Sequence, residues 1–257
     1  MVMEAETHHQ IAELDPVLVG LDHPDKDVRQ QTALSLGHQP RAELSADIAR
    51  ALWQEPDFFV RETLTWVLIQ TPGPAVEAAR RILHDADSAT RLQALHVLSK
   101  VADPTTVDTV SDYIDDANPA VAEKARYALA RIGDPRVIPQ LVDRLGDVDL
   151  ATRDAMTKTL TEFGEQAVPA LVAALEAPEP VVRAHAAEVL CFVGSPASVG
   201  AVPALVDRLE DENPEVRLGV AMALRELSEH PMANQALRTA THENSDPRVR
   251  SVARASV

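Results

Sequence analysis

Apolar residues recur along this chain with a helical period, in blocks that return every 30 to 34 residues. Numbered from an arginine that recurs in the blocks, the apolar positions are −1, +3, +6, +7 and +10. In one block these are Val182, Ala186, Val189, Leu190 and Val193. At about 100° per residue they share one face of a helix. No useful length alternates with period two, so the pattern predicts amphipathic helices and no sheet.

The blocks share a register of Arg followed seven residues later by Leu. The register positions are Arg29, Arg61, Arg91, Ala122, Arg153, Arg183, Arg217 and Arg250, and their partners are Leu36, Leu68, Leu98, Leu129, Leu160, Leu190, Leu224 and Val257. A repeat of this length cannot bury its own apolar face and stacks on its neighbours. The register therefore predicts about eight stacked units.

Each unit reads as a helical hairpin. Four residues before the register position lies a residue that can cap a helix: Asp25, Asp57, Asp87, Asn118, Asp149, Glu179, Asn213 or Asp246. Short acidic and amide side chains accept hydrogen bonds from the first turn, so Glu179 fits least well. A second apolar segment closes eight residues before the register position, at Leu21, Trp53, Leu83, Ile114, Leu145, Leu175 and Leu209. Glycines near the predicted helix ends are Gly37, Gly73, Gly133, Gly164 and Gly194.

Segments such as NPEVRLGVAMALREL, DPRVIPQLVDRL and EPVVRAHAAEVLCFVG resemble HEAT repeats, of the HEAT-like type also found in phycobilin lyases. The resemblance covers residues 13–257 and implies an all-α fold, an α-α superhelix forming a right-handed solenoid of about eight hairpins. Residues 13–257 would form one domain, preceded by a flexible N-terminus at 1–12. The family includes scaffolds, adaptors, regulators and a few enzymes, so the resemblance bears on fold more than on function.

The recurring acid and arginine have a structural interpretation. Asp at −4 and Arg at 0 have the favourable order for an ion pair within one helix. The resemblance implies that such pairs also run as a ladder between neighbouring repeats. Ala122 replaces the arginine in the fourth unit, which predicts an interruption of the ladder there.

Charge narrows the classes of partner. The chain has 40 acidic and 24 basic residues, a net charge of −16. Such a field repels nucleic acid and anionic membranes. The first ten residues lack a basic start and an apolar stretch, and no apolar run approaches the roughly 18 residues of a membrane span, which favours a cytoplasmic protein. One cysteine, Cys191, excludes an intramolecular disulfide.

Motifs for catalysis or metal binding are absent from the sequence. It contains no H-E-x-x-H, C-x-x-C or G-x-S-x-G and no glycine-rich phosphate loop. The pairs Asp85/Asp87 and Asp147/Asp149 lack the other ligands of a calcium loop and are interpreted as caps. Adjacent histidines His8 and His9 do not make a metal site, and a di-iron hydroxylase of this repeat type would need several His-Glu pairs where the chain has one, His242-Glu243. We expect no cofactor and no metal.

The face opposite the core carries the residues that do not repeat. Position +5 holds a ring in three successive units, which predicts three adjacent rings about 8–10 Å apart. With their neighbours on the same face, the candidate binding residues are Phe59, Trp66, Leu92, His96, Lys100, Tyr127 and Arg131. The alternative is that the Trp66 and Tyr127 side chains fill grooves between repeats. Cys191 and Phe192 are a second, weaker candidate surface, since a small buried cysteine is common.

The sequence therefore favours a non-enzymatic scaffold that binds a peptide or protein segment on its concave surface. Aromatic burial would supply affinity, and Lys100 and Arg131 would bind an acidic stretch of the partner. The alternative is a bilin- or small-ligand-handling subunit of the HEAT-like lyase type, which predicts a deep pocket. The sequence leaves open whether the protein is an enzyme and what its oligomeric state is.

Overall fold

The computed structural model describes residues 16–84, 87–147 and 149–256, and within these ranges the chain is helical with no strand. The all-α superhelical repeat fold is therefore confirmed. The chain groups into two compact units, residues 1–101 and 102–257. The expected flexible segment at 1–12, the pair His8 and His9, the cap residue Asp85 and the terminal Val257 lie outside the described residues.

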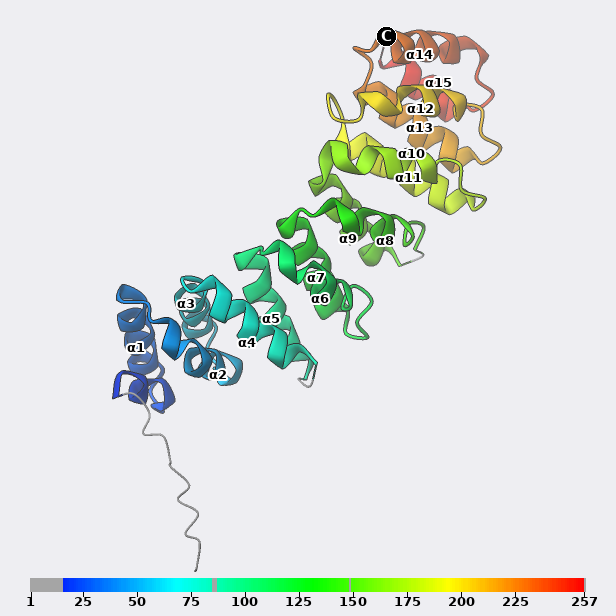
Figure 1. Cartoon of the computed structure of the whole chain (residues 1–257). Helices are drawn as coiled ribbons and strands as arrows, with labels where there is room; N and C mark the ends of the chain where they lie inside the picture. The colour runs from blue at the N-terminus through cyan, green and yellow to red at the C-terminus, as the bar shows by residue number, and fades with distance from the viewer. Residues whose placement is uncertain (1–15, 85–86, 148, 257) are drawn as a thin grey trace, which may run out of the picture. The chain divides into compact units, whose positions relative to one another are not determined.

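The first unit alternates first and second helices of successive hairpins (Figure 1). Its second helices α1, α3 and α5 pack side by side, as do the first helices α2 and α4. The elements are η1 (Pro16–Asp22), α1 (Lys26–His38), η2 (Ala42–Leu44), α2 (Ser45–Gln54), α3 (Phe58–Ile69), α4 (Pro72–Leu83) and α5 (Ser88–Val101).

The second unit has the same alternation, with first helices that are shorter than those of the first unit except for α14. The second helices are α7 (Pro119–Ile132), α9 (Leu150–Glu162), α11 (Pro180–Val193), α13 (Pro214–Glu226) and α15 (Pro247–Arg254). The first helices are α6 (Val107–Ser111), α8 (Ile138–Val142), α10 (Val168–Ala174), α12 (Val202–Asp207) and α14 (Pro231–Glu243). Short 3-10 turns precede four of them: η3 (Pro104–Thr106), η4 (Pro135–Val137), η5 (Gly164–Ala167) and η6 (Val199–Ala201).

The predicted N-caps are confirmed. Seven of the eight cap side chains accept a hydrogen bond from a backbone N–H in the first turn: those of Asp25, Asp57, Asp87, Asn118, Asp149, Asn213 and Asp246. Glu179, the poorest fit, occupies the cap position without a side-chain hydrogen bond. Its longer side chain does not suit the short cap geometry.

The predicted core face is also confirmed. On α11, Ala186, Val189 and Leu190 are fully buried, whereas the predicted Val182 and Val193 near the helix ends are half-buried. On α7 the equivalent Ala125, Ala128 and Leu129 are buried. Burial of such faces between stacked hairpins is the main stabilising term of a repeat array.

Four of the five glycines predicted near helix ends lie there, and Gly73 is the exception. Gly133 ends α7 in the left-handed conformation, with φ 70°, as expected. Gly73 lies in the first turn of α4, and Gly37 is buried near the end of α1. Gly37 is needed for close approach, because a Cβ there would overlap the ring of Trp66.

The register arginines bind differently from the predicted pairing within one helix. Five register arginines donate from Nη1 to two backbone carbonyls of the loop before their own helix: Arg29, Arg61, Arg183, Arg217 and Arg250. The cap carboxylate at −4 accepts backbone N–H groups instead. The arginine thus stabilises a loop whose carbonyls have no helical partner.

The remaining guanidinium nitrogens of three of these arginines reach the next repeat. Arg29 pairs with Glu55 at 2.7 Å, and Arg183 makes a two-pronged contact with Asp211 at 2.9 Å for both bonds. Glu55 and Asp211 lie two residues before the cap of the next helix and accept the backbone N–H of that cap residue. The ladder between neighbouring repeats is therefore present at these positions, and it joins the loops.

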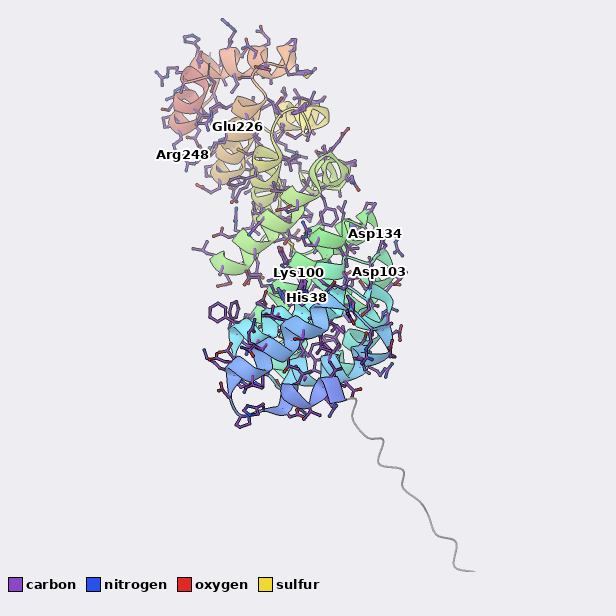
Figure 2. The ribbon with its side chains drawn as sticks, turned by 90° about the vertical axis from the view of Figure 1, so that its left-hand side faces the viewer. His38, Lys100, Asp103, Asp134, Glu226 and Arg248 are labelled. Atoms are coloured by element: carbon purple, nitrogen blue, oxygen red, sulfur yellow. The ribbon has the colours of Figure 1, made fainter. Side chains whose placement is uncertain are left out.

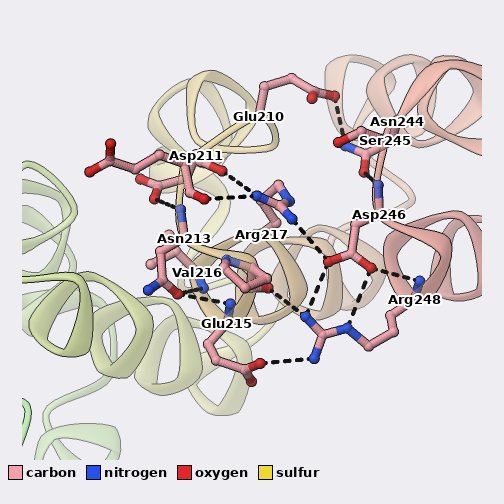
Figure 3. A network of polar contacts seen from close by, with 12 residues as sticks. Glu210, Asp211, Asn213, Glu215, Val216, Arg217, Asn244, Ser245, Asp246 and Arg248 are labelled. Carbon is pink, nitrogen blue, oxygen red and sulfur yellow. Dashed lines mark hydrogen bonds and ion pairs between the residues drawn. The ribbon is translucent and has the colours of Figure 1, made fainter.

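The same arrangement links the last two repeats (Figure 3). Asp246 accepts from both Arg217 and Arg248, at 3.2 and 3.1 Å, and Arg248 also contacts Glu215. The hydrogen bonds from the side chain and backbone of Arg248 lower the pKa of Asp246 to about 2. Asn244 lies two residues before this cap, the position that Glu55 and Asp211 occupy in their loops, and its side chain accepts a hydrogen bond from the backbone N–H of Asp246.

The predicted interruption at Ala122 is filled by a different arginine. Ala122 is buried, and Arg126, one turn later on α7, donates to the carbonyl of Ile114 at 2.8 Å. Burial lowers the pKa of Arg126, which is almost fully enclosed.

A buried histidine joins three elements of the second unit. His185 on α11 is fully buried, its Nδ1 accepts from the backbone N–H of Gly146, and its Nε2 lies 2.8 Å from the hydroxyl of Thr157 on α9. Because Nδ1 accepts, Nε2 carries the proton and donates to Thr157. Burial, with a smaller effect from Arg153, lowers the pKa of His185 to about 4.

Arg183→Leu should lower the free energy of unfolding by about 3–5 kcal/mol, because it leaves the Asp211 carboxylate buried without its partner. Urea unfolding followed by helical circular dichroism measures the loss. The matched control is Arg136→Leu, since Arg136 forms an exposed pair with Asp134 and its loss should cost at most about 1 kcal/mol. Equal losses in the two variants would contradict the structural role of the ladder.

Stability should fall as the pH is lowered from about 6.5 to about 4, because His185 stays neutral in the folded protein while it binds a proton in the unfolded chain. The lowered pKa corresponds to a contribution on the order of 3 kcal/mol, present above the unfolded pKa and lost at the acid end of this window. Urea midpoints at pH 7.5, 6 and 4.5 measure it. His185→Gln should be less stable at pH 7.5 but should lose much of the slope; an unchanged slope would rule out this origin.

Candidate functional site

In the first unit, the Trp66 side chain packs between repeats and also reaches solvent. Its ring lies against Gly37 of the neighbouring helix α1, where no side chain intervenes, and 44% of the residue remains exposed. The amide of Gln70 also reaches the carbonyl of Gly37. Trp66 therefore fills space between repeats, which was one of the two alternatives from the sequence, and its binding to a partner stays a prediction.

Phe59 lies at the start of α3, where it is among the most exposed apolar residues at 71%. Its ring contacts that of Phe58 edge to face, with centroids 5.6 Å apart. Phe58 is itself 59% exposed. Two adjacent exposed rings form an apolar knob on this unit.

His96 on α5 lies next to α3. Its Nε2 is 3.1 Å from a carboxylate oxygen of Glu62, one turn before Trp66. Leu92, one turn before His96, is half-buried, and Lys100 is exposed near the end of α5 (Figure 2). The structure therefore places five of the predicted residues on the adjacent second helices α3 and α5 of one unit: Phe59, Trp66, Leu92, His96 and Lys100.

Tyr127 and Arg131 belong to the second unit, on α7. Tyr127 is 42% exposed, and its ring is covered by the ammonium of Lys124, 5.0 Å from the centroid. This cation–π contact was missed from the sequence, where Arg131 was the expected basic neighbour. Arg131 shares with Tyr127 a small hollow of about 140 Å³ between α7 and α9. The predicted adjacency of Tyr127 to the rings of the first unit stays a prediction.

A groove of about 800 Å³ lies between the second helices α11 and α13 of the second unit. We call it the α11–α13 groove. It is lined along almost the whole length of both helices by Arg153, Pro180, Val181, Ala184, Glu188, Cys191, Phe192, Asn213, Glu215, Leu218, Gly219, Met222, Arg225 and Glu226.

The groove combines small residues at its centre with large apolar residues at its edges. A Cβ at Gly219 would make ordinary van der Waals contact, 3.4 Å from the Cβ of Ala187 and 3.5 Å from the carbonyl of Ala184, so the glycine leaves about the space of a methyl group between the two helices. Phe192 is 64% exposed, Val181 52% and Met222 38%. Large apolar side chains of this kind are usually covered, so these three form an exposed apolar patch.

Charged residues at the rim are paired with one another. Arg153 on α9 contacts Glu188, and Arg225 contacts its neighbour Glu226 near the end of α13 (Figure 2). Arg153 is a register arginine, yet the loop position where Arg183 finds Asp211 is occupied in its case by Ala177, which has no acceptor side chain. The arginine therefore lines the groove.

Cys191 lies in this groove and is partly exposed. Burial and the nearby carboxylate of Glu226 raise the pKa of its thiol. A thiol that stays protonated is a weak nucleophile, so the geometry gives Cys191 no catalytic role.

The α11–α13 groove is continuous with two smaller hollows across neighbouring second helices. Glu188 and Phe192 also line a hollow of about 460 Å³ between α9 and α11, and Lys158 and Glu162 line both that hollow and the one at Tyr127. The four helices α7, α9, α11 and α13 thus present one row of hollows.

From the sequence, only Cys191 and Phe192 of this groove are predicted as a candidate surface, the second of two. A signal for the rest is present: position +9 of the sixth unit is Phe192, and positions +1 and +5 of the seventh are Leu218 and Met222. The spacing of α11 and α13 depends on packing between repeats and does not follow from the helical period.

Within the described ranges, His, Cys, Asp and Glu side chains form no group of three or more that could hold a metal ion. Each helix in those ranges is too short or too polar to cross a membrane.

Solved structures with similar folds share little sequence with this chain. Kap121p matches with a TM-score of 0.61 and 12% identity over 93% of this chain and 32% of its own. Kap95p, from a study of its binding to RanGDP, matches with a TM-score of 0.54 and 15% identity, over 91% of this chain and 38% of its own. The CpcE–CpcF complex of phycocyanin lyase from Nostoc matches with a TM-score of 0.43 and 19% identity, covering 100% of each chain.

No curated protein matches the sequence. The family model for HEAT repeats matches three times, at residues 76–161, 141–201 and 168–257. These matches run without a gap from residue 76 to the end, well over half of the chain, and agree with the helical hairpins and the superhelical fold of the two best-matched structures. The chain therefore belongs to the HEAT-repeat family.

Proposed function

We propose that this protein is a non-enzymatic interaction scaffold that binds a segment of a partner protein on the faces of its second helices. The observation that carries the proposal is the α11–α13 groove, an apolar hollow of about 800 Å³ that the described residues of the chain leave open. Binding would bury Phe192, Val181 and Met222, and apolar burial of this kind is the main source of affinity.

The distribution of aromatic residues supports the proposal. The chain has only two Trp, two Tyr and four Phe, and Phe58, Phe59, Trp66, Tyr127 and Phe192 are all more than a third exposed. In a repeat array such residues normally fill the space between hairpins. Their exposure on second helices fits a binding surface, and Kap95p offers a precedent, since that protein of similar fold binds RanGDP.

The proposal includes the surface predicted from the sequence. Phe59, Trp66, Leu92, His96 and Lys100 would form a contact surface on the first unit, with the acidic stretch of the partner at Lys100. On the second unit, Tyr127 and Arg131 would extend the surface from the α11–α13 groove along the row of hollows. A cytoplasmic location remains part of the proposal.

Affinity purification from the native organism, read by mass spectrometry, should identify a partner whose recovery falls about tenfold or more with the double variant Phe192→Ser/Met222→Ser, because hot-spot apolar residues contribute about 2 kcal/mol or more each. Met232→Ser is the matched control, since Met232 is an exposed apolar residue on the first helix α14, outside the groove. Circular dichroism confirms that both variants fold.

A partner that binds equally well to the Phe192/Met222 variant would exclude the α11–α13 groove. Phe59→Ser and Tyr127→Ala then test the remaining surface. If recovery of the partner survives all of these substitutions, the second-helix faces are not its binding site.

A further inference from the structure

We infer that the α11–α13 groove accommodates one amphipathic α-helix, about three turns long, with an apolar face toward the groove and basic residues on its other side. The inference rests on the proposed scaffold function and adds the class of partner. Three features of the groove carry it: its length, the spacing of its walls and its charge.

The length matches a short helix. The walls run from Val181 to Phe192 on α11 and from Glu215 to Glu226 on α13. At 1.5 Å per residue each wall is about 16–17 Å long, which corresponds to about 11 residues of a bound helix. An extended segment would cover the same length with only about five residues.

The wall spacing favours a helix over an extended chain. Groove residues recur every three or four positions on each wall, as in Ala184 and Glu188 on α11 and Leu218 and Met222 on α13. An amphipathic helix presents its apolar residues with the same period, so its ridges fit between those of the walls. Side chains on one face of a strand repeat about every 6.6 Å, longer than the roughly 5.4 Å turn of a helix.

Small residues permit close approach at the centre of the groove. Ala184 is 9% exposed, and Gly219 has no side chain to hold a third helix away. Phe192 and Met222 would then contact the flanks of the bound helix. Such an arrangement of a small-residue floor and large apolar walls is suited to an aliphatic stripe.

Charge selects a basic partner. The second unit contains 25 acidic and 15 basic residues, a net charge of −10. At the groove itself, the guanidinium groups of Arg153 and Arg225 are already paired with Glu188 and Glu226. Their charge is neutralised locally, so the surrounding negative field dominates and attracts a cationic helix.

The single cysteine reports directly on occupancy of the groove. Cys191 lines it and is partly exposed, so a bound helix should shield its thiol from a maleimide. The probe is a 14-residue peptide of Leu and Lys with leucines at helical spacing. Two comparison peptides have the same leucine pattern, one with Glu in place of Lys and one with two central prolines that prevent helix formation. Intact-mass spectrometry of the full chain gives the alkylation rate of Cys191.

The Leu/Lys peptide should slow alkylation about tenfold at saturation, and the other two should have little effect. In Phe192→Ser/Met222→Ser the protection should be lost, whereas Phe58→Ser should retain it. Neutralising the rim with Glu188→Gln or Glu226→Gln should weaken binding of the peptide about two- to fivefold each at low salt. Glu165→Gln, an exposed acid outside the groove, is the matched control and should have no effect.

Equal protection by the Leu/Glu peptide would overturn the basic partner, and equal protection by the proline peptide would overturn the helix. No protection by any peptide would overturn the inference as a whole. None of these results contradicts the proposed scaffold function if binding of the natural partner still requires Phe192 and Met222. If the partner binds the Phe192/Met222 variant normally and no peptide protects Cys191, both proposals fail at this groove.

Discussion

The structure depends on the way each loop between hairpins is tied to the repeat before it. A register arginine binds two carbonyls of its own loop and, in the pairs of Arg29 with Glu55 and Arg183 with Asp211, a carboxylate of the next loop. That carboxylate also accepts the N–H of the residue that caps the next helix. Because one side chain satisfies several groups that helices leave without partners, the loops are short, and the apolar faces of successive helices are held in register.

The groove arises where this connection changes. In the sixth repeat Ala177 replaces the loop acid and Glu179 makes no cap hydrogen bond, so Arg153 turns to Glu188 on the outer face of α11. The same repeat retains its connection to the following one through Arg183 and Asp211, and there α11 packs closely on α13, with Gly219 facing the small residues Ala184 and Ala187. A departure from the repeat pattern and a close helix contact therefore meet at one site.

Much of the fold could be predicted from the sequence because it depends on local chemistry. Caps such as Asp57 and Asn213, and core residues such as Leu190, follow from side-chain geometry and helical period alone. The partner of each arginine could not be predicted in the same way. An arginine four residues after an acid can pair within its helix, and only the position of the next loop shows that Arg183 binds Asp211 instead.

The candidate site was harder to predict for a physical reason. Which face of a helix is outside the core follows from its period, but the exposure of a side chain on that face depends on how closely the next helix approaches. Trp66 illustrates this: Gly37 lets its ring sink between two helices, so a residue that looks like a binding determinant is also a packing element. Phe192 is the opposite case, since the described part of the second unit leaves 64% of it exposed, against 44% for Trp66.

Glycine thus has two different effects in this repeat array. At Gly37 the space that a side chain would take is filled by the ring of Trp66 from the neighbouring repeat, which closes that space. At Gly219 the neighbouring residues are Ala184 and Ala187, which are too small to fill the space above the contact, and an open groove remains with Met222 and Phe192 on its walls. Whether a close helix contact produces core or binding surface is decided by the size of the residue opposite the glycine, and this pairing spans two repeats.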